Sequence, residues 1–172
     1  MDRDRDRDRA DRARLAELLD LHEGRGPVPQ LDEGAIADLL AARPRVAVVG
    51  ASDRPGRPSR DVFLDLVRAG VDAVPVTPRF AAVGGVTAWP DLAAAVAATG
   101  PFAIVDVFRR AEECPAHAAE AVAAGARVLW LQLGIVSWEA ARIARAGGLG
   151  VVMDRCLSVE LRRLGGRAVS PG

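Results

Sequence analysis

The sequence contains no lysine, no asparagine and no tyrosine, so all 23 of its basic residues are arginines. The absence of lysine excludes Schiff-base catalysis and the P-loop, whose phosphate-binding lysine has no candidate in this chain. The two cysteines, Cys114 and Cys156, do not make a disulfide framework and favour a reduced, cytoplasmic protein. No apolar run is long enough to span a membrane, and the N-terminus is charged rather than signal-like.

Charge and aromatic content give no indication of a nucleic-acid surface. The basic residues are balanced by 23 acidic ones, and only three Trp and four Phe are available for base stacking. The chain has 172 residues, of which 50% are hydrophobic, and this predicts one globular domain with a sizeable core. We therefore expect neither a nucleic acid nor a membrane as its partner.

The chain divides into four segments. Residues 1–9 alternate Asp and Arg without any apolar side chain, and we expect them to form a disordered tail. Residues 10–43 carry two short amphipathic patterns separated by a Pro/Gly-rich break, and these predict accessory helices. Residues 44–165 form the main domain, and residues 166–172 are expected to be a flexible C-terminus.

Short apolar runs alternate with helical patterns throughout the main domain. The runs predict strands, and these cover residues 46–49, 72–76, 102–108, 127–133 and 149–153. The helical patterns cover residues 60–69, 91–98, 112–124, 137–146 and a last segment that ends near 164. Such alternation predicts an α/β fold, a doubly wound parallel sheet of about five strands with helices on both faces.

The first strand and the first helix of this domain enclose a loop that suits a nucleotide. The strand ends at Gly50, the loop contains Gly56, and Ser59 precedes the helical pattern. Free N–H groups at a helix N-terminus favour phosphate, so this order of elements is typical of the first corner of a nucleotide-binding βαβ unit. The same order of elements also fits an ordinary βα turn, and both interpretations stay open at this point.

Ligands of doubly wound sheets bind beyond the carboxyl ends of the strands, and these ends argue against an ordinary NAD enzyme. The G-x-G-x-x-G fingerprint is absent, because five other residues separate Gly50 from Gly56. The second strand ends in Thr77, Pro78 and Arg79 instead of an acidic residue for the ribose. Arg79 would suit an extra phosphate, either the 2′-phosphate of NADP or the 3′-phosphate of coenzyme A, unless it is a solvated loop residue.

Five motifs occur in an order and spacing that resemble a known family. They are VAVVGASDRPGRPS at 46–59, VPVTPR at 74–79, DVFRR at 106–110, WLQLG at 130–134 and VMDRC at 152–156. Together they resemble the small stand-alone CoA-binding domain proteins of bacteria, whose Rossmann-like domain is similar to that of succinyl-CoA synthetase α subunits. The resemblance covers residues 36–164.

The resemblance implies that the chain binds coenzyme A or an acyl-CoA, as a non-catalytic carrier, sensor or subunit. Around the phosphates it places Gly50, Ala51, Ser52, Arg57, Pro58 and Ser59. Beside the adenosine ring and 3′-phosphate it places Thr77, Pro78 and Arg79, and along the nucleotide and pantetheine Val107, Phe108 and Arg109. The family usually has Asn where this chain has Thr77, so a side-chain amide contact is lost there. A second copy or another protein is a possible partner.

The sequence has few candidates for catalysis. Neither His22 nor His117 has a His or Cys partner at metal-ligand spacing, so no metal site is predicted. Cys156 is the one reactive candidate, since it follows a strand beside Arg155 and could form a mixed disulfide with the CoA thiol. A buried structural cysteine is the favoured interpretation. Asp106 and Asp154 are candidates for a carboxylate pair, and we assign them no acid–base role.

Two alternatives come from other classes of protein. An NADP-dependent oxidoreductase needs a proton donor, and the lack of Tyr and Lys removes the usual pair. The other alternative is an interaction subunit with a vestigial nucleotide pocket, whose N-terminal helices form the docking surface.

Overall fold

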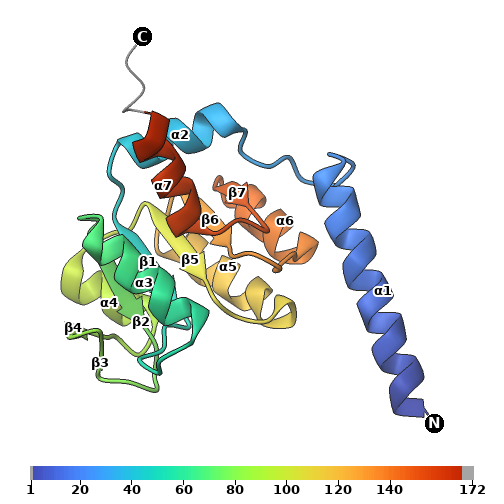
Figure 1. The fold of residues 1–172 in the computed structure, drawn as a ribbon, viewed down its shortest axis with the longest axis horizontal. Coiled ribbons are helices and arrows are strands. Elements are labelled where there is room, and N and C mark those ends of the chain that lie inside the picture. Colours follow the sequence, from blue (N-terminus) through green and yellow to red (C-terminus); the bar gives the residue numbers. More distant parts are fainter. Residues whose placement is uncertain (1, 168–172) are drawn as a thin grey trace.

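Five parallel strands form a single sheet in a computed structural model of the protein, which describes residues 2–167 (Figure 1). The sheet consists of β1 (Val46–Val49), β2 (Ala73–Val76), β5 (Ile104–Val107), β6 (Val128–Leu131) and β7 (Gly150–Val152). Their order across the sheet is β2-β1-β5-β6-β7, and every neighbouring pair is parallel. The predicted doubly wound α/β fold is confirmed, and the chain reverses its direction of winding between β1 and β5.

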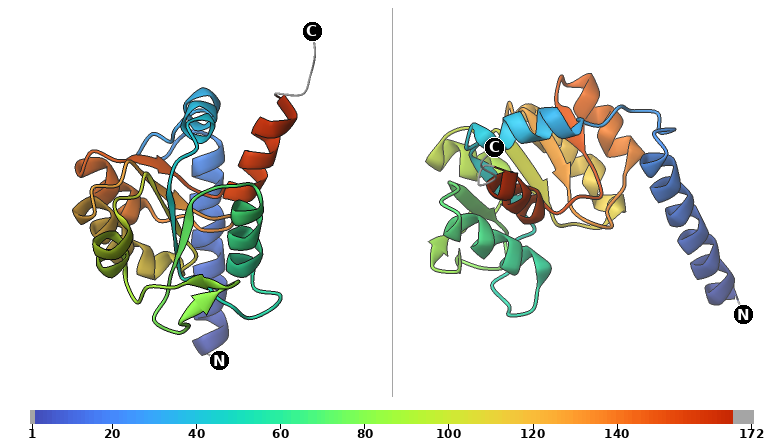
Figure 2. Two further views of the ribbon diagram at one scale, coloured as in Figure 1. Left: turned by 90° about the vertical axis from the view of Figure 1, so that its left-hand side faces the viewer. Right: turned by 45° about the horizontal axis from the view of Figure 1, so that its top comes forward.

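Helices cover both faces of the sheet, as Figure 2 shows. One face packs against α2 (Glu33–Ala41), α3 (Pro58–Arg68) and α7 (Leu157–Arg167). The other packs against α4 (Leu92–Thr99), α5 (Cys114–Ala123) and α6 (Trp138–Ala146). Successive side chains of a strand point to opposite faces, so Val48 lies in the first layer and Val49 in the second. Because both layers are apolar, the strands are buried on both sides.

Helix starts follow the capping residues of the sequence. Asp32, Asp91 and Ser137 each accept a hydrogen bond from the backbone N–H three residues later, at 2.8, 2.8 and 3.3 Å. The helix predicted for residues 112–124 begins instead with a 3₁₀ turn, Ala111–Glu113, which leads into α5.

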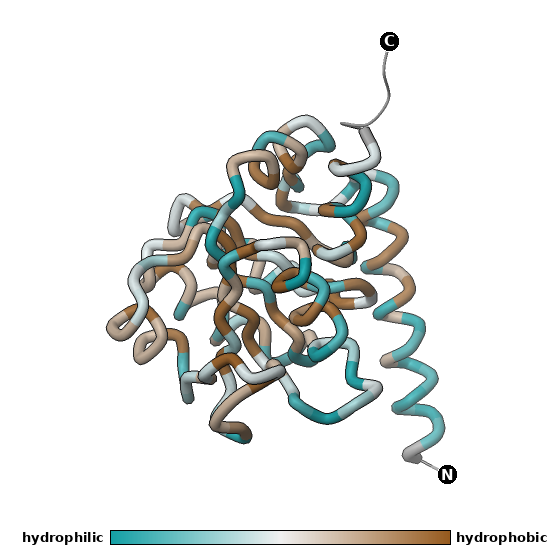
Figure 3. The backbone as a smooth tube through the Cα atoms, turned by 60° about the vertical axis from the view of Figure 1, so that its left-hand side comes forward, coloured by the Kyte–Doolittle hydropathy of each residue, from teal (hydrophilic) through white to brown (hydrophobic). Residues whose placement is uncertain are grey.

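The N-terminal segment differs from the expected disordered tail, because α1 spans Asp2–His22 as one helix. Asp and Arg alternate, so side chains three positions apart carry opposite charges, and no Gly or Pro interrupts the run. Extending a helix that residues 10–22 already form costs less than nucleating one. Figure 3 shows that the outer part of α1 is hydrophilic, whereas Leu18 and Leu21 pack against the core.

A small hairpin, absent from the sequence prediction, connects β2 to α4. It pairs β3 (Ala82–Val83) with β4 (Val86–Thr87) through Gly84 and Gly85, both with positive φ (55° and 81°). Two such residues are what a tight hairpin turn requires. The N–H of Gly84 donates to Asp53 at 2.8 Å, which joins the hairpin to the loop after β1.

Two further points concern the whole chain. None of the helices between residues 2 and 167 is both long and apolar enough to cross a membrane. The C-terminus expected to be flexible comprises residues 166–172. Helix α7 continues to Arg167, and residues 168–172 lie outside the part of the chain that the structure describes.

Candidate functional site

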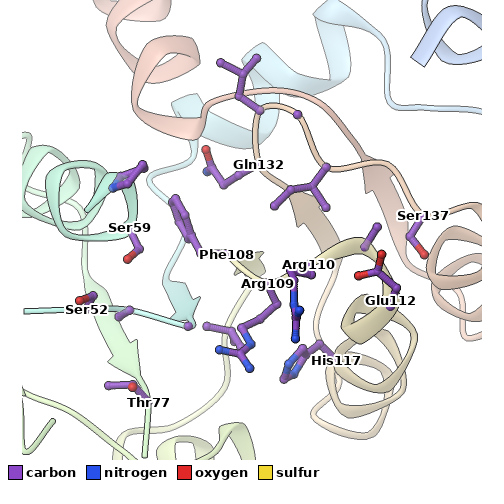
Figure 4. A pocket seen from close by; sticks show the side chains of 18 of the residues that line it. Ser52, Ser59, Thr77, Phe108, Arg109, Arg110, Glu112, His117, Gln132 and Ser137 are labelled. Atoms are coloured by element: carbon purple, nitrogen blue, oxygen red, sulfur yellow. The ribbon is translucent and has the colours of Figure 1, made fainter. Parts of the chain in front are cut away.

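A cleft of about 1610 Å³ runs along the carboxyl edge of the sheet (Figure 4). Its walls come from the loops after β1, β2, β5 and β6, and from one side of α1. The cleft lies where the chain winds in opposite directions from the neighbouring strands β1 and β5, so that α3 and α5, which follow these strands, cover opposite faces of the sheet. The cleft exceeds the roughly 300–1,000 Å³ of ordinary small-molecule pockets, so it suits an elongated ligand.

Gly50 allows the loops after β1 and β5 to approach each other. Its φ is 81°, and a Cβ at this position would lie 2.7 Å from the carbonyl oxygen of Phe108 and 2.8 Å from Cδ of Arg109. Any side chain would therefore combine a strained backbone with a clash against a main-chain atom. Glycine here keeps the first βα corner tight and the floor of the cleft open.

The N-terminus of α3 borders the cleft without a side-chain cap. The N-cap residue Arg57 makes no capping hydrogen bond, and Pro58 at the first helical position has no N–H. Arg57, Pro58 and Ser59 all line the cleft. The partial positive charge of this helix end therefore faces the cleft, which suits an anion.

Three arginines strengthen the positive character of this end of the cleft. Arg54, Arg57 and Arg79 line it, and none of them pairs with an acidic side chain in the described part of the chain. By contrast, Arg60 lies 3.6 Å from Asp53 and is already partnered. Three guanidinium groups without counter-charges beside a helix N-terminus are suited to binding several phosphate oxygens.

Thr77 shapes the loop after β2. Its side chain is buried, and its Oγ1 accepts a hydrogen bond from the backbone N–H of Arg79 at 3.2 Å. Because a hydroxyl also carries a donor hydrogen, that hydrogen is left for a further acceptor. Thr77, Pro78 and Arg79 all line the cleft.

The loop after β5 corrects one predicted site residue. The side chain of Val107 is fully buried in the layer that holds α5, and it does not line the cleft. Strand alternation turns it inward, whereas Phe108 and Arg109 beyond the strand end line the cleft. Arg109 pairs with Glu113 at 2.5 Å. Burial alone would raise the pKa of the Glu113 carboxyl, but the guanidinium groups of Arg109 and Arg110 lower it overall. Every other predicted binding residue lines the cleft.

The opposite end of the cleft carries more acidic groups. Acidic residues from α1, α5, α6 and the turn before α5 line it, and they are Asp11, Glu17, Glu112, Glu120 and Glu139. His117 also borders the cleft, with Nδ1 2.9 Å from Oε2 of Glu120. Arg14 donates to the carbonyl oxygen of Gly134 at 2.6 Å, which holds α1 against the loop after β6. Within residues 2–167, no cluster of three His, Cys, Asp or Glu side chains has the arrangement of a metal site.

Gln132 is a cleft residue for which the sequence patterns predict no role. It follows β6, lines the cleft and is only 4% exposed. Its Nε2 donates to both carboxyl oxygens of Asp106, at 2.7 and 2.9 Å. Asp106 is 0% exposed, and burial raises its pKa to about 8 although the Gln132 hydrogen bond opposes that rise. One signal was visible in the sequence, since Asp106 is a charged residue within an apolar strand.

Asp106 and Asp154 do not form a carboxylate pair, because each has other partners. Asp154 accepts the backbone N–H of Gly134 at 2.6 Å and lies 2.8 Å from Nε2 of His22. These contacts hold the end of α1 and the loop after β6 at the edge of β7. Asp154 therefore has a structural role in the fold.

The two cysteines lie in different surroundings. Cys156 is half-buried at the start of α7, borders the cleft and has its Sγ 3.4 Å from Oγ of Ser158. Cys114 is fully buried, and burial raises the pKa of its thiol to about 12. Cys156, for which the sequence favoured a buried structural role, is therefore less buried than Cys114 and borders the cleft.

Comparisons with known proteins agree with this architecture. A family model described as a CoA binding domain matches residues 44–162. The uncharacterized protein YneT of Bacillus subtilis is 40% identical over 124 residues, which cover 72% of this chain and 90% of YneT. A solved hypothetical protein from Pyrococcus horikoshii is 30% identical with a TM-score of 0.74, covering 79% of this chain and 94% of the other. A solved Thermus thermophilus protein is 33% identical with a TM-score of 0.71, covering 78% and 99%.

Proposed function

Because the chain belongs to the CoA-binding domain family, we propose that it binds coenzyme A or an acyl-CoA as a non-catalytic carrier, sensor or subunit. The ligand lies across the carboxyl ends of β2, β1, β5 and β6, in the cleft described above. The proposal includes a cytoplasmic location, where free CoA and reduced thiols coexist.

One observation carries this proposal: three arginines that have no acidic partner among residues 2–167 occupy the same end of an elongated cleft as a helix N-terminus without a side-chain cap. Coenzyme A has a matching asymmetry, because its nucleotide carries a diphosphate and a 3′-phosphate while its pantetheine arm is uncharged. The diphosphate lies at the N-terminus of α3, near Ser52, Arg57 and Ser59. The 3′-phosphate lies near Thr77 and Arg79, and Phe108 flanks the nucleotide where the arm begins.

Thermal unfolding in the presence of different nucleotides tests the proposal. A ligand that binds only the folded protein raises the melting temperature by mass action. We expect a rise with about 1 mM CoA and a smaller rise with dephospho-CoA, which lacks the 3′-phosphate. A rise with NADP alone would favour an oxidoreductase instead. No rise with CoA, dephospho-CoA, NADP or NAD would favour an interaction subunit with a vestigial pocket.

A further inference from the structure

The Gln132 carboxamide has one end held by the protein and one end free. Its Nε2 is engaged by the Asp106 carboxyl group, whereas its Oε1 has no hydrogen-bond partner among the described residues. The residue is only 4% exposed and yet lines the cleft. This oxygen is not among the fully buried unpartnered atoms of the described residues, so it stays accessible from the cleft to a ligand group that donates a hydrogen bond.

Asp106 fixes the direction in which this oxygen points. The carboxyl group lies inside the sheet, at the level of Val48 in β1 and Trp130 in β6, and is 0% exposed. Both of its oxygens accept from the same Nε2, so the nitrogen end of the amide is drawn inward. Asp106 does not line the cleft, but it holds the amide of Gln132, which does. Asp106 is a positioning residue in this arrangement.

The register of the strands places Gln132 beyond the phosphate end of the cleft. Val107 pairs with Leu131 at the ends of β5 and β6, so Phe108 and Gln132 each follow one residue beyond these neighbouring strands, and both are labelled in Figure 4. Gln132 therefore lies two strands from β1, roughly 10 Å across the sheet. A ligand whose phosphates occupy the N-terminus of α3 reaches Gln132 with the part that follows its diphosphate.

On the basis of the proposed function, we propose that Oε1 of Gln132 accepts a hydrogen bond from an amide N–H of the pantetheine arm. The arm carries amide groups between the diphosphate and the thiol, and an amide N–H is the complement of an unpartnered carbonyl oxygen. Gln132 thereby distinguishes coenzyme A from an adenosine nucleotide that carries a 3′-phosphate and a 5′-phosphate but no arm.

Calorimetric titration with coenzyme A and with adenosine 3′,5′-bisphosphate, which lacks the arm, tests this proposal. In Gln132→Leu we expect a loss of about 3- to 10-fold in affinity for CoA, since one hydrogen bond is removed, and unchanged affinity for the bisphosphate. The matched control is Gln30→Leu, because Gln30 is the other glutamine and does not line the cleft. This control should bind both ligands like the wild type.

Substitutions of Asp106 test its positioning role. Asp106→Leu removes the acceptor for Nε2 and should weaken CoA binding about as much as Gln132→Leu does, again without an effect on the bisphosphate. Asp106→Asn keeps a carbonyl acceptor and should bind CoA within about 2-fold of the wild type. If Asp106→Leu does not fold, the Gln132→Leu result decides alone.

The outcomes separate this inference from the proposed function. Wild-type affinity for CoA in Gln132→Leu would overturn the inference and leave CoA binding intact. An equal loss of affinity for both ligands would also overturn the inference, because Gln132 and Asp106 would then only maintain the shape of the cleft. Wild-type protein that binds neither ligand would overturn the proposed function itself.

Discussion

Replacing Asp106 by asparagine is expected to change how the stability of the protein depends on pH. In the folded protein burial raises the Asp106 pKa from 3.8 to about 8, whereas the unfolded chain exposes this carboxyl to water. Between these two values the folded state keeps a proton that the unfolded state has lost. The stability of the wild type therefore falls as pH rises through this window, and the loss is complete above pH 8.

The magnitude follows from the width of that window. Within it, each pH unit costs the wild type about 1.4 kcal/mol of unfolding free energy through this one group. The asparagine side chain in Asp106→Asn has no titratable proton, while its carbonyl oxygen can still accept from Nε2 of Gln132. Between pH 5 and pH 7 the stability of this variant should therefore rise relative to the wild type by roughly 2–3 kcal/mol.

Urea unfolding of both proteins at pH 5, 6 and 7 measures this difference directly. All other titrating groups are shared, so their contributions cancel when the two curves are subtracted. Asp38→Asn is a suitable control, because it makes the same chemical change at a carboxyl that is exposed on α2. A difference between Asp106→Asn and the wild type that stays constant from pH 5 to pH 7 would refute the reasoning, since Asp106 would then be ionised in the folded protein.

Three further predictions concern the cleft. Arg79→Ala should weaken CoA binding by about 1–3 kcal/mol and change the affinity for dephospho-CoA little. Calorimetric titration with both ligands measures this, and equal losses of affinity would mean that the 3′-phosphate lies elsewhere. Arg57→Ala should weaken both ligands by similar amounts in the same experiment, because the diphosphate is common to them, and wild-type affinity for both would contradict its role. Gly50→Ala should lower the free energy of unfolding by about 2–4 kcal/mol, as measured by urea unfolding. The reason is that the residue has a φ of 81° and a Cβ would lie 2.7 Å from the Phe108 carbonyl oxygen. A loss below about 1 kcal/mol would mean that the loops after β1 and β5 move apart easily.

Local residue patterns determined the class of the fold and most of the candidate site. The apolar runs and the capping residues Asp91 and Ser137 mark strands and helix starts through interactions within a few residues, so they can be read without the fold. Residues that follow a parallel strand must lie at its carboxyl edge whatever the strand order is. For that reason Gly50 and Thr77 could be placed on the ligand side in advance.

Contacts between distant segments could be decided only by the tertiary structure. The position of Val107 depended on which way the last strand residue turns, and the structure turns it into the core. The pairing of Asp106 with Gln132 depended on β5 and β6 being neighbours in register, which no local pattern specifies. The position of α1 beside the cleft also depends on a distant contact, since Arg14 donates a hydrogen bond to the carbonyl oxygen of Gly134, 120 residues away. Such contacts depend on the packing free energy of the whole chain. A local sequence pattern contains information only on the interactions between residues that are close in sequence.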